Sequence, residues 1–196
     1  MVANDNPDTG EAAVLIERLG RLMRAAEHES GLNPAQWECL RYLARCNRFS
    51  NSPTALTEYL AATKGTISQT LNALQRKGLI TKHKRPKERR SVVLALTQQG
   101  WDMLGQDPWW RLARHEARLT PDTRDGLRMG LRQFVLAELQ HNKHKTFGIC
   151  TSCHHFEAAN RQESPTASHH CRLLKIVLND NESKQVCVHH ESPPEP

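Results

Sequence analysis

The chain has 196 residues, enough to bury one sizeable hydrophobic core and to carry a small additional module. Lys and Arg number 27 against 21 Asp and Glu, and the formal charge of +6 suits a polyanionic partner. No apolar run approaches the roughly 20 residues that cross a bilayer, and residues 1–10 are too polar for a signal peptide, so we expect a cytoplasmic protein with a disordered leader and no membrane contact.

The N-terminal half shows helical periodicity in four stretches. The predicted helices are 11–29, 34–46, a short one from 53 to about 61, and 66–77. Asn33 and Pro34 form a helix start signal, and Gly31 and Gly78 are typical helix ends. We place the turn between the third and fourth helices at residues 63–65, where Gly65 would relieve a tight bend.

A different pattern follows from Leu79. Two extended runs flank the strongly basic segment 82–90, which predicts a β-hairpin with a charged tip. Thr97 begins a further helix, Pro108 kinks or restarts it, and a last helix is expected from Pro121 to about His144.

Two short helices joined by a turn and followed by a basic hairpin are the parts of a winged helix-turn-helix. Four sequence motifs resemble those of the MarR family of bacterial transcription regulators. They are LTEYL at 56–60, TISQTLNAL at 66–74, KGLI at 77–80 and LTQQG at 96–100. The resemblance covers roughly residues 11–145 and implies a mainly α fold with a small β-hairpin wing, set between N- and C-terminal dimerisation helices. At the wing tip the family's acidic-arginine pattern is altered, because Arg85 stands at its first acid and Glu88 at its second.

The fourth predicted helix and the hairpin carry the candidate DNA-binding residues. Short hydrogen-bonding groups on the solvent face of this helix could read base edges in the major groove, and a lysine at its start could reach phosphate. The hairpin tip has the charge to follow the backbone into the minor groove. The helix set is Lys64, Thr66, Ser68, Gln69 and Asn72, and the wing set is Lys84, Arg85, Lys87, Arg89 and Arg90. The alternative is that both are ordinary solvated surfaces.

The resemblance also implies a homodimer that binds an inverted-repeat operator in double-stranded DNA, with repression as the default. Its interface could be formed by apolar residues of the first and last helices, or these residues could be core within one subunit. They are Leu15, Leu19, Leu22, Leu127, Leu131 and Phe134. Four tryptophans could be core, which is the more common role, or could line a small-molecule effector pocket: Trp37, Trp101, Trp109 and Trp110.

The C-terminal segment 146–190, which the usual MarR domain lacks, is rich in Cys, His, Ser and Asn. Cys150, Cys153, Cys171 and Cys187 have the spacing C-x2-C-x17-C-x15-C among several histidines, one of which could replace a thiolate. Four thiolates can hold a zinc ion or an iron-sulfur cluster, although the split second half departs from a zinc ribbon and the cysteines could instead be reactive or incidental. Cys39 and Cys46 fit small core or interface residues, and 191–196 a disordered tail.

These patterns together predict a sequence-specific, DNA-binding dimeric repressor that responds to metal or redox state through its cysteine-rich tail. In the alternative, the tail is a zinc-stabilised protein-interaction module and not a sensor. An enzyme is not expected, because the chain has no Gly-rich phosphate loop, no nucleophile elbow and no HExxH motif.

Overall fold

The computed structural model describes residues 10–29, 31–85, 88–160 and 168–193. Its first part runs α1 (Glu11–His28), α2 (Pro34–Arg45), α3 (Pro53–Tyr59), α4 (Lys64–Arg76), β1 (Ile80–Arg85), β2 (Glu88–Leu96), α5 (Gln98–Gly105), α6 (Trp109–Glu116) and α7 (Pro121–His141). The C-terminal part has the short strands β3 (Gly148–Ile149), β4 (Phe156–Glu157), β5 (His169–Cys171), β6 (Ile176–Leu178) and β7 (Val186–Cys187). The expected order of helices and hairpin is confirmed. The predicted leader and tail fall largely on residues 1–9 and 194–196, outside the described ranges.

Side-chain caps explain why most of the helices begin where they do. Asn33, Ser52, Thr63, Thr97 and Thr120 each accept a hydrogen bond from the backbone N–H three residues further on. Each bond satisfies one of the donors that a helix leaves unpaired in its first turn. Three of these caps are followed directly by proline, whose fixed φ suits the first helical position.

The predicted start of α4 was wrong by two residues. Gly65 does not form the turn but lies in the first turn of the helix, because Thr63 caps it and accepts from the Thr66 N–H at 3.1 Å. The bend lies earlier, where Ala61 adopts the left-handed conformation with φ 49°. Gly78, with φ 71°, does end α4 as expected. The last helix ends at His141, three residues before the predicted His144.

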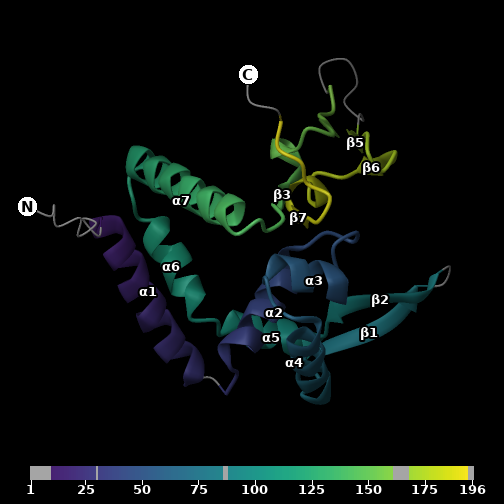
Figure 1. Cartoon of the computed structure of the whole chain (residues 1–196), viewed down its shortest axis with the longest axis horizontal. Coiled ribbons are helices and arrows are strands. Elements are labelled where there is room, and N and C mark those ends of the chain that lie inside the picture. The colour runs from purple at the N-terminus through teal and green to yellow at the C-terminus, as the bar shows by residue number, and fades with distance from the viewer. Residues whose placement is uncertain (1–9, 30, 86–87, 161–167, 194–196) are drawn as a thin grey trace, which may run out of the picture.

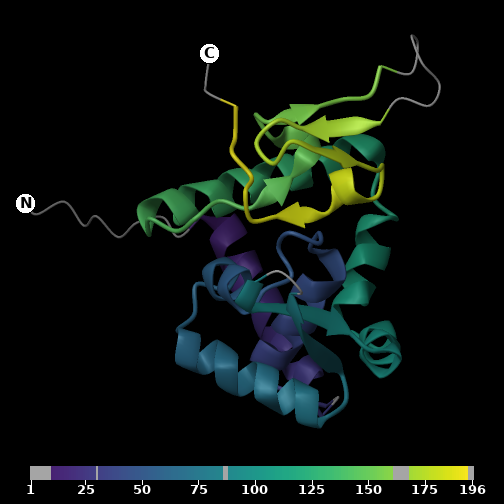
Figure 2. The ribbon, with the colours of Figure 1, turned by 90° about the vertical axis from the view of Figure 1, so that its right-hand side faces the viewer.

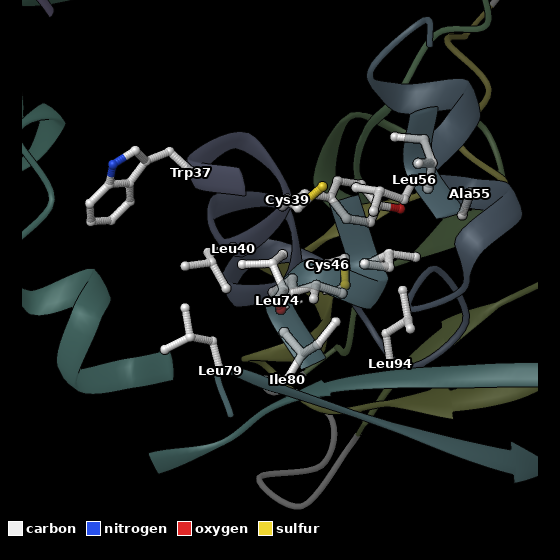
Figure 3. Packing of buried hydrophobic residues seen from close by; sticks show 14 of the residues in the cluster. Trp37, Cys39, Leu40, Cys46, Ala55, Leu56, Leu74, Leu79, Ile80 and Leu94 are labelled. Atoms are coloured by element: carbon white, nitrogen blue, oxygen red, sulfur yellow. Dashed lines mark hydrogen bonds between the residues drawn. The ribbon is translucent and has the colours of Figure 1, made fainter. Parts of the chain in front are cut away.

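The hydrophobic core lies where α2, α3 and α4 pack over the hairpin. Figure 3 shows Leu40, Leu74, Leu79 and Ile80 converging beside the strands, with Trp37 to one side of this group. The C-terminal segment also contributes, since Val188 is part of this same buried cluster. The division into a winged helix domain and a separate cysteine-rich module therefore stays a prediction.

The hairpin projects away from the helices (Figure 1). Its strands are antiparallel, with Ile80 opposite Leu96 and an irregular register at Lys84 and Arg85. At its base the Leu94 N–H donates to the Asn51 carbonyl at 2.8 Å, which ties the hairpin to the loop before α3.

The helices α1, α6 and α7 extend on the side opposite the hairpin, and the C-terminal strands lie beside α3 and α7 (Figures 1 and 2). Large apolar side chains on α1 and α7 remain in solvent. The six residues named for a dimer interface are 41–59% exposed, so they are not core within a single chain. Within the described ranges, no helix combines the length and apolar character needed to cross a bilayer.

Candidate nucleic-acid interface and cysteine-rich module

The α4 helix presents one apolar and one polar face because its large apolar residues recur every three to four positions. Ile67, Leu71 and Leu74 are buried against the core. All five predicted DNA-contacting residues of this helix, Lys64, Thr66, Ser68, Gln69 and Asn72, are exposed. Their placement agrees with the expectation, and their contact with DNA stays a prediction.

Two of these side chains already have partners. The Thr66 hydroxyl lies 2.9 Å from the Thr63 hydroxyl, so it takes part in the helix cap. The Lys82 ammonium donates to Asn72 Oδ1 at 2.5 Å. This bond fixes the orientation of the Asn72 amide, whose NH2 group remains able to donate and whose oxygen keeps a second lone pair.

Lys82 was not among the predicted site residues. Sequence reasoning began the wing's basic set at Lys84, although the alternation of side chains along β1 could have indicated that Lys82 faces α4. Partial burial lowers the pKa of Lys82. Its bond to Asn72 links the wing to the polar face of α4, so the two candidate surfaces are continuous.

The wing residues are only partly described. Lys84 is exposed on β1. The backbone of Arg85 belongs to β1 and that of Arg89 and Arg90 to β2, but their side chains lie outside what the structure describes, as does the whole of Lys87. These four assignments stay predictions.

Short strands and turns place the four C-terminal cysteines close together. Cys150 and Cys153 flank a turn closed by a 2.9 Å bond from the Cys153 N–H to the Cys150 carbonyl. Cys187 on β7 pairs with Gly148 on β3, while Cys171 ends β5. The pKa of Cys150 is raised to about 11, first by burial and then, in decreasing order, by the nearby thiols of Cys187, Cys153 and Cys171. All six cysteines are free thiols.

The chemistry of these four thiols fits a soft cation such as zinc or the iron of a cluster. In the part of the chain that the structure describes, however, no three His, Cys, Asp or Glu side chains are grouped so that they could hold a metal ion. The cysteines are gathered but not arranged as a preformed coordination site, and the metal stays a prediction.

The histidines of this segment differ in their surroundings. His169 lies 3.0 Å from Asp180 and accepts the Ala159 N–H, and His155 lies 2.9 Å from Glu191. His190 is 7% exposed, with Nε2 at 3.0 Å from the Ser152 carbonyl and a buried Nδ1 that has no hydrogen-bond partner. Of the three histidines His155, His169 and His190, His190 is therefore the one whose buried Nδ1 could bind a metal ion.

The remaining candidates are divided between core and surface. Cys39 and Cys46 are buried, as expected, and burial raises the pKa of each to about 12. Trp37 is fully buried. The expectation of a core role was wrong for Trp101, Trp109 and Trp110, which are 50%, 38% and 52% exposed. They lie on α5 and α6, beyond the reach of the main core.

Comparison with known proteins identifies the winged helix. Residues 30–91 match the model of the MarR family. The structure of Staphylococcus aureus MepR in complex with DNA has a TM-score of 0.51 and 16% identity, covering 64% of this chain and 96% of that one. A MarR transcriptional regulator from Methanosarcina mazei Go1 has a TM-score of 0.51 and 22% identity, covering 67% and 96%.

CouR from Rhodococcus jostii RHA1, solved with bound p-coumaroyl-CoA, has a TM-score of 0.50 and 17% identity, covering 65% of this chain and 92% of that one. At these identities the likeness establishes the fold alone. No match is found among curated proteins. The matched family consists of transcription regulators and not of enzymes, in agreement with the expectation from the sequence.

Proposed function

We propose that the chain is a sequence-specific DNA-binding transcription regulator that acts as a homodimeric repressor on an inverted-repeat operator, since its residues 30–91 match the model of the MarR family. The observation that carries the proposal is the exposed polar face of α4 beside a basic hairpin. A helix of this kind places short donors and acceptors in the major groove while the wing follows the phosphates. The likeness of the fold to MepR, which was solved with DNA, supports this assignment.

The exposed apolar residues of α1 and α7 support the dimer. Burying a fully exposed side chain of this size contributes about 1.5–3 kcal/mol, and a monomer leaves roughly half of that gain unused at each of the six residues, which are 41–59% exposed. Leu19 and Leu131, for example, are 41% and 42% exposed. A symmetric pair formed through these helices would place two copies of α4 on successive turns of DNA, and two half-sites related by a two-fold axis read as an inverted repeat.

Selection from a random DNA pool, followed by gel-shift titration at several salt concentrations, tests the function. Lys64→Ala and Lys84→Ala should weaken binding to every sequence and flatten its salt dependence, since each removes a phosphate contact. Gln69→Ala should instead change the preferred sequence. Arg114→Ala on α6, which is also basic and exposed, is the matched control and should leave binding unchanged.

Two results would contradict the assignment. One is a failure of selection to enrich any sequence. The other is an affinity and salt dependence in Lys64→Ala and Lys84→Ala equal to those of the wild type.

The regulator further responds to metal or redox state through Cys150, Cys153, Cys171 and Cys187. The turn that joins Cys150 to Cys153 and the pairing of Cys187 with Gly148 support a common ligand. The bound group would be a zinc ion or an iron-sulfur cluster. It would link chain segments that have few apolar residues of their own and would stabilise their fold. The four cysteines would hold it.

Metal analysis of the protein purified without air, with an absorbance spectrum, separates these outcomes. A brown protein indicates a cluster, and a colourless protein with zinc a structural ion. If the protein contains zinc and removal of the zinc leaves operator affinity unchanged, the result favours the alternative function. In that case the tail is a zinc-stabilised protein-interaction module and not a sensor. Full metal content in both Cys171→Ser and Cys187→Ser would rule out the four-cysteine site.

A further inference from the structure

The C-terminal segment 146–190 is paired with the loop that joins α2 to α3. The Asn47 N–H donates to the Val186 carbonyl at 3.0 Å, and Cys46 forms a parallel β-bridge with Val186. Val186 lies on β7, which also pairs with β3, and Figure 1 shows these two strands next to α3 and the loop before it. The first residues of the loop therefore belong to the same hydrogen-bonded ladder as the C-terminal strands.

Ser50, further along the loop, provides a buried acceptor for the C-terminal segment. It is fully buried, and its hydroxyl accepts from the Val188 N–H at 2.8 Å and donates to Asn47 Oδ1 at 2.8 Å. A buried backbone N–H without an acceptor is strongly unfavourable, so the Val188 amide depends on this hydroxyl. The Val188 side chain is 8% exposed and belongs to the main core. The segment and the loop therefore share both a buried hydrogen bond and apolar packing.

Two further contacts join the C-terminal segment to this part of the winged helix. Arg48 of the loop forms an ion pair with Glu182 at 3.1 Å. Phe147 packs edge-on against Tyr59, the last residue of α3, with ring centroids 5.1 Å apart. The contact surface therefore reaches from the loop to the end of the first helix of the helix-turn-helix.

The same loop supports two of the elements that surround the proposed DNA-binding surface. The Leu94 N–H of wing strand β2 donates to the Asn51 carbonyl at 2.8 Å, and Ser52 caps α3 by accepting the Ala55 N–H at 3.2 Å. Residues 46–52 therefore connect β7 to the wing and to α3. A displacement of the loop is passed on to both, because closely packed interiors have little free space in which to absorb it.

We infer that the C-terminal segment is a functional part of the DNA-binding unit: docked on the loop 46–52, it holds the wing and α3 in the position that DNA binding requires. Ser50 and Val188 are then positioning residues, which act through the loop and, being buried, do not touch DNA. The inference rests on the proposed DNA-binding function and needs no bound metal, because its contacts are between protein groups alone. A chain in which this docking is loosened should fold but hold its wing less firmly.

Hydrogen exchange measured on the full chain tests the connection independently of DNA. Val188→Ala loosens the docking from the C-terminal side, and Ser50→Ala removes the acceptor on the loop. Both should speed up exchange in residues 46–52 and 92–96 as well as in the C-terminal segment, and Val188→Ala keeps the test decisive if Ser50→Ala does not fold. Val177→Ala trims the same kind of side chain at a 52% exposed position of β6, so it is the matched control and should leave the loop and the wing unchanged. Faster exchange confined to the C-terminal segment would overturn the inference.

Operator affinity at several salt concentrations supplies the second measurement. Val188→Ala and Ser50→Ala should lose about threefold or more in affinity, within the range for residues that couple distant sites. Their salt dependence should also be shallower, because a loosely held wing contacts fewer phosphates. A variant that is only less stable would contain less active protein in a stoichiometric titration, and its active fraction would bind with the affinity and salt dependence of the wild type. That result in both variants would contradict the inference.

The ion pair of Arg48 with Glu182 gives a test in which charge and positioning predict opposite signs. Glu182→Ala removes a negative charge, so electrostatics alone should tighten binding to DNA. It also breaks the contact with the loop, and the inference predicts binding weaker by about twofold, in keeping with a partly exposed ion pair. Glu157→Ala removes an equal charge whose partner, Arg172, lies within the C-terminal segment, so it is the matched control and should not weaken binding.

Equal or tighter binding by Glu182→Ala relative to Glu157→Ala would count against the inference. If the wild type selects no DNA sequence, the proposed function fails, while the exchange data still decide whether the C-terminal segment holds the loop and the wing.

Discussion

The guanidinium of Arg41 on α2 donates two hydrogen bonds, of 2.7 and 2.6 Å, to the carboxylate of Asp107, which lies in the link between α5 and α6. The same guanidinium reaches Glu27 of α1 at 2.6 Å. Both carboxylates are almost completely buried, and the Trp109 indole N–H donates to Glu27 at 2.7 Å. One arginine therefore joins three segments that are distant in sequence, and it fixes how α1 and α6 leave the winged helix domain.

Arg41→Ala should lower the free energy of unfolding by about 3 kcal/mol or more, because it leaves two buried carboxylates without a counter-charge. Arg41→Lys should cost less, since it keeps the charge but cannot make the bidentate contact. Urea denaturation measures both. Arg45→Ala, at an exposed position one turn further on, should stay within about 0.5 kcal/mol of the wild type. A similar small change for Arg41→Ala would show that the ion cluster adds nothing to stability.

The proposed dimer predicts the effect of a charge placed on α1 or α7. Leu131→Glu on α7 and Leu19→Glu on α1 should convert the protein from dimer to monomer and abolish operator binding, because burying an unpaired carboxylate costs several kcal/mol. Light scattering coupled to size-exclusion chromatography gives the mass directly. Gln140→Glu, which adds a charge at an exposed polar position of α7, is the control. If both leucine variants remain dimers, the interface lies elsewhere.

The helices were predictable from the sequence because the signals for them are local. Capping residues and apolar spacing act within a few positions, and they gave the boundaries to within three residues; the start of α4 was misplaced because Thr63 was not recognised as the cap, and the end of α7 was placed three residues too late. The ion cluster of Arg41 was missed because its partners are up to 66 residues away. The docking of Val188 into the main core was missed for a similar reason: one apolar residue in a polar segment shows no period.

The candidate site divides in the same way. The exposed face of α4 follows from helical periodicity, so the sequence alone was enough to place its five polar residues on that face. Alternation along β1 could have indicated the face on which Lys82 lies, but its contact with Asn72 depends on how the hairpin packs against α4, which is not a local property of the sequence. The gathering of the four cysteines depends on strand pairings of two or three residues, too short to be detected from composition.

The cysteines should differ in reactivity toward iodoacetamide. The thiolate is the reactive form, so a raised pKa keeps the thiolate fraction low at neutral pH, and that fraction increases about tenfold per unit as the pH rises toward the pKa. Cys39 and Cys46, buried and with pKa near 12, should therefore remain unlabelled between pH 7 and 9. The half-buried Cys153 and Cys171 should be labelled in metal-free protein and protected by Zn²⁺.

Mass spectrometry of digested protein reports each position separately. Labelling in urea is the control, in which all six cysteines should react. The prediction fails if Cys46 is modified in native protein as fast as Cys153, or if Zn²⁺ protects Cys39 and Cys46 but not the cysteines of the tail.

The bond from Lys82 to Asn72 predicts a specific change in base preference. The 2.5 Å bond from Lys82 holds the Asn72 oxygen toward the wing, so the amide should contact DNA mainly through its NH2 group and favour a base with an acceptor at the groove edge. Asn72→Ala should then reduce discrimination at one base pair of each half-site by about 1–3 kcal/mol. Lys82→Met frees the amide to turn either way, and it should reduce discrimination at that same base pair. A base-by-base scan of the operator measures both. Lys84→Met removes a neighbouring exposed ammonium and should weaken binding equally at all sequences. If Lys82→Met behaves in the same uniform manner, Lys82 contacts phosphate and does not orient Asn72.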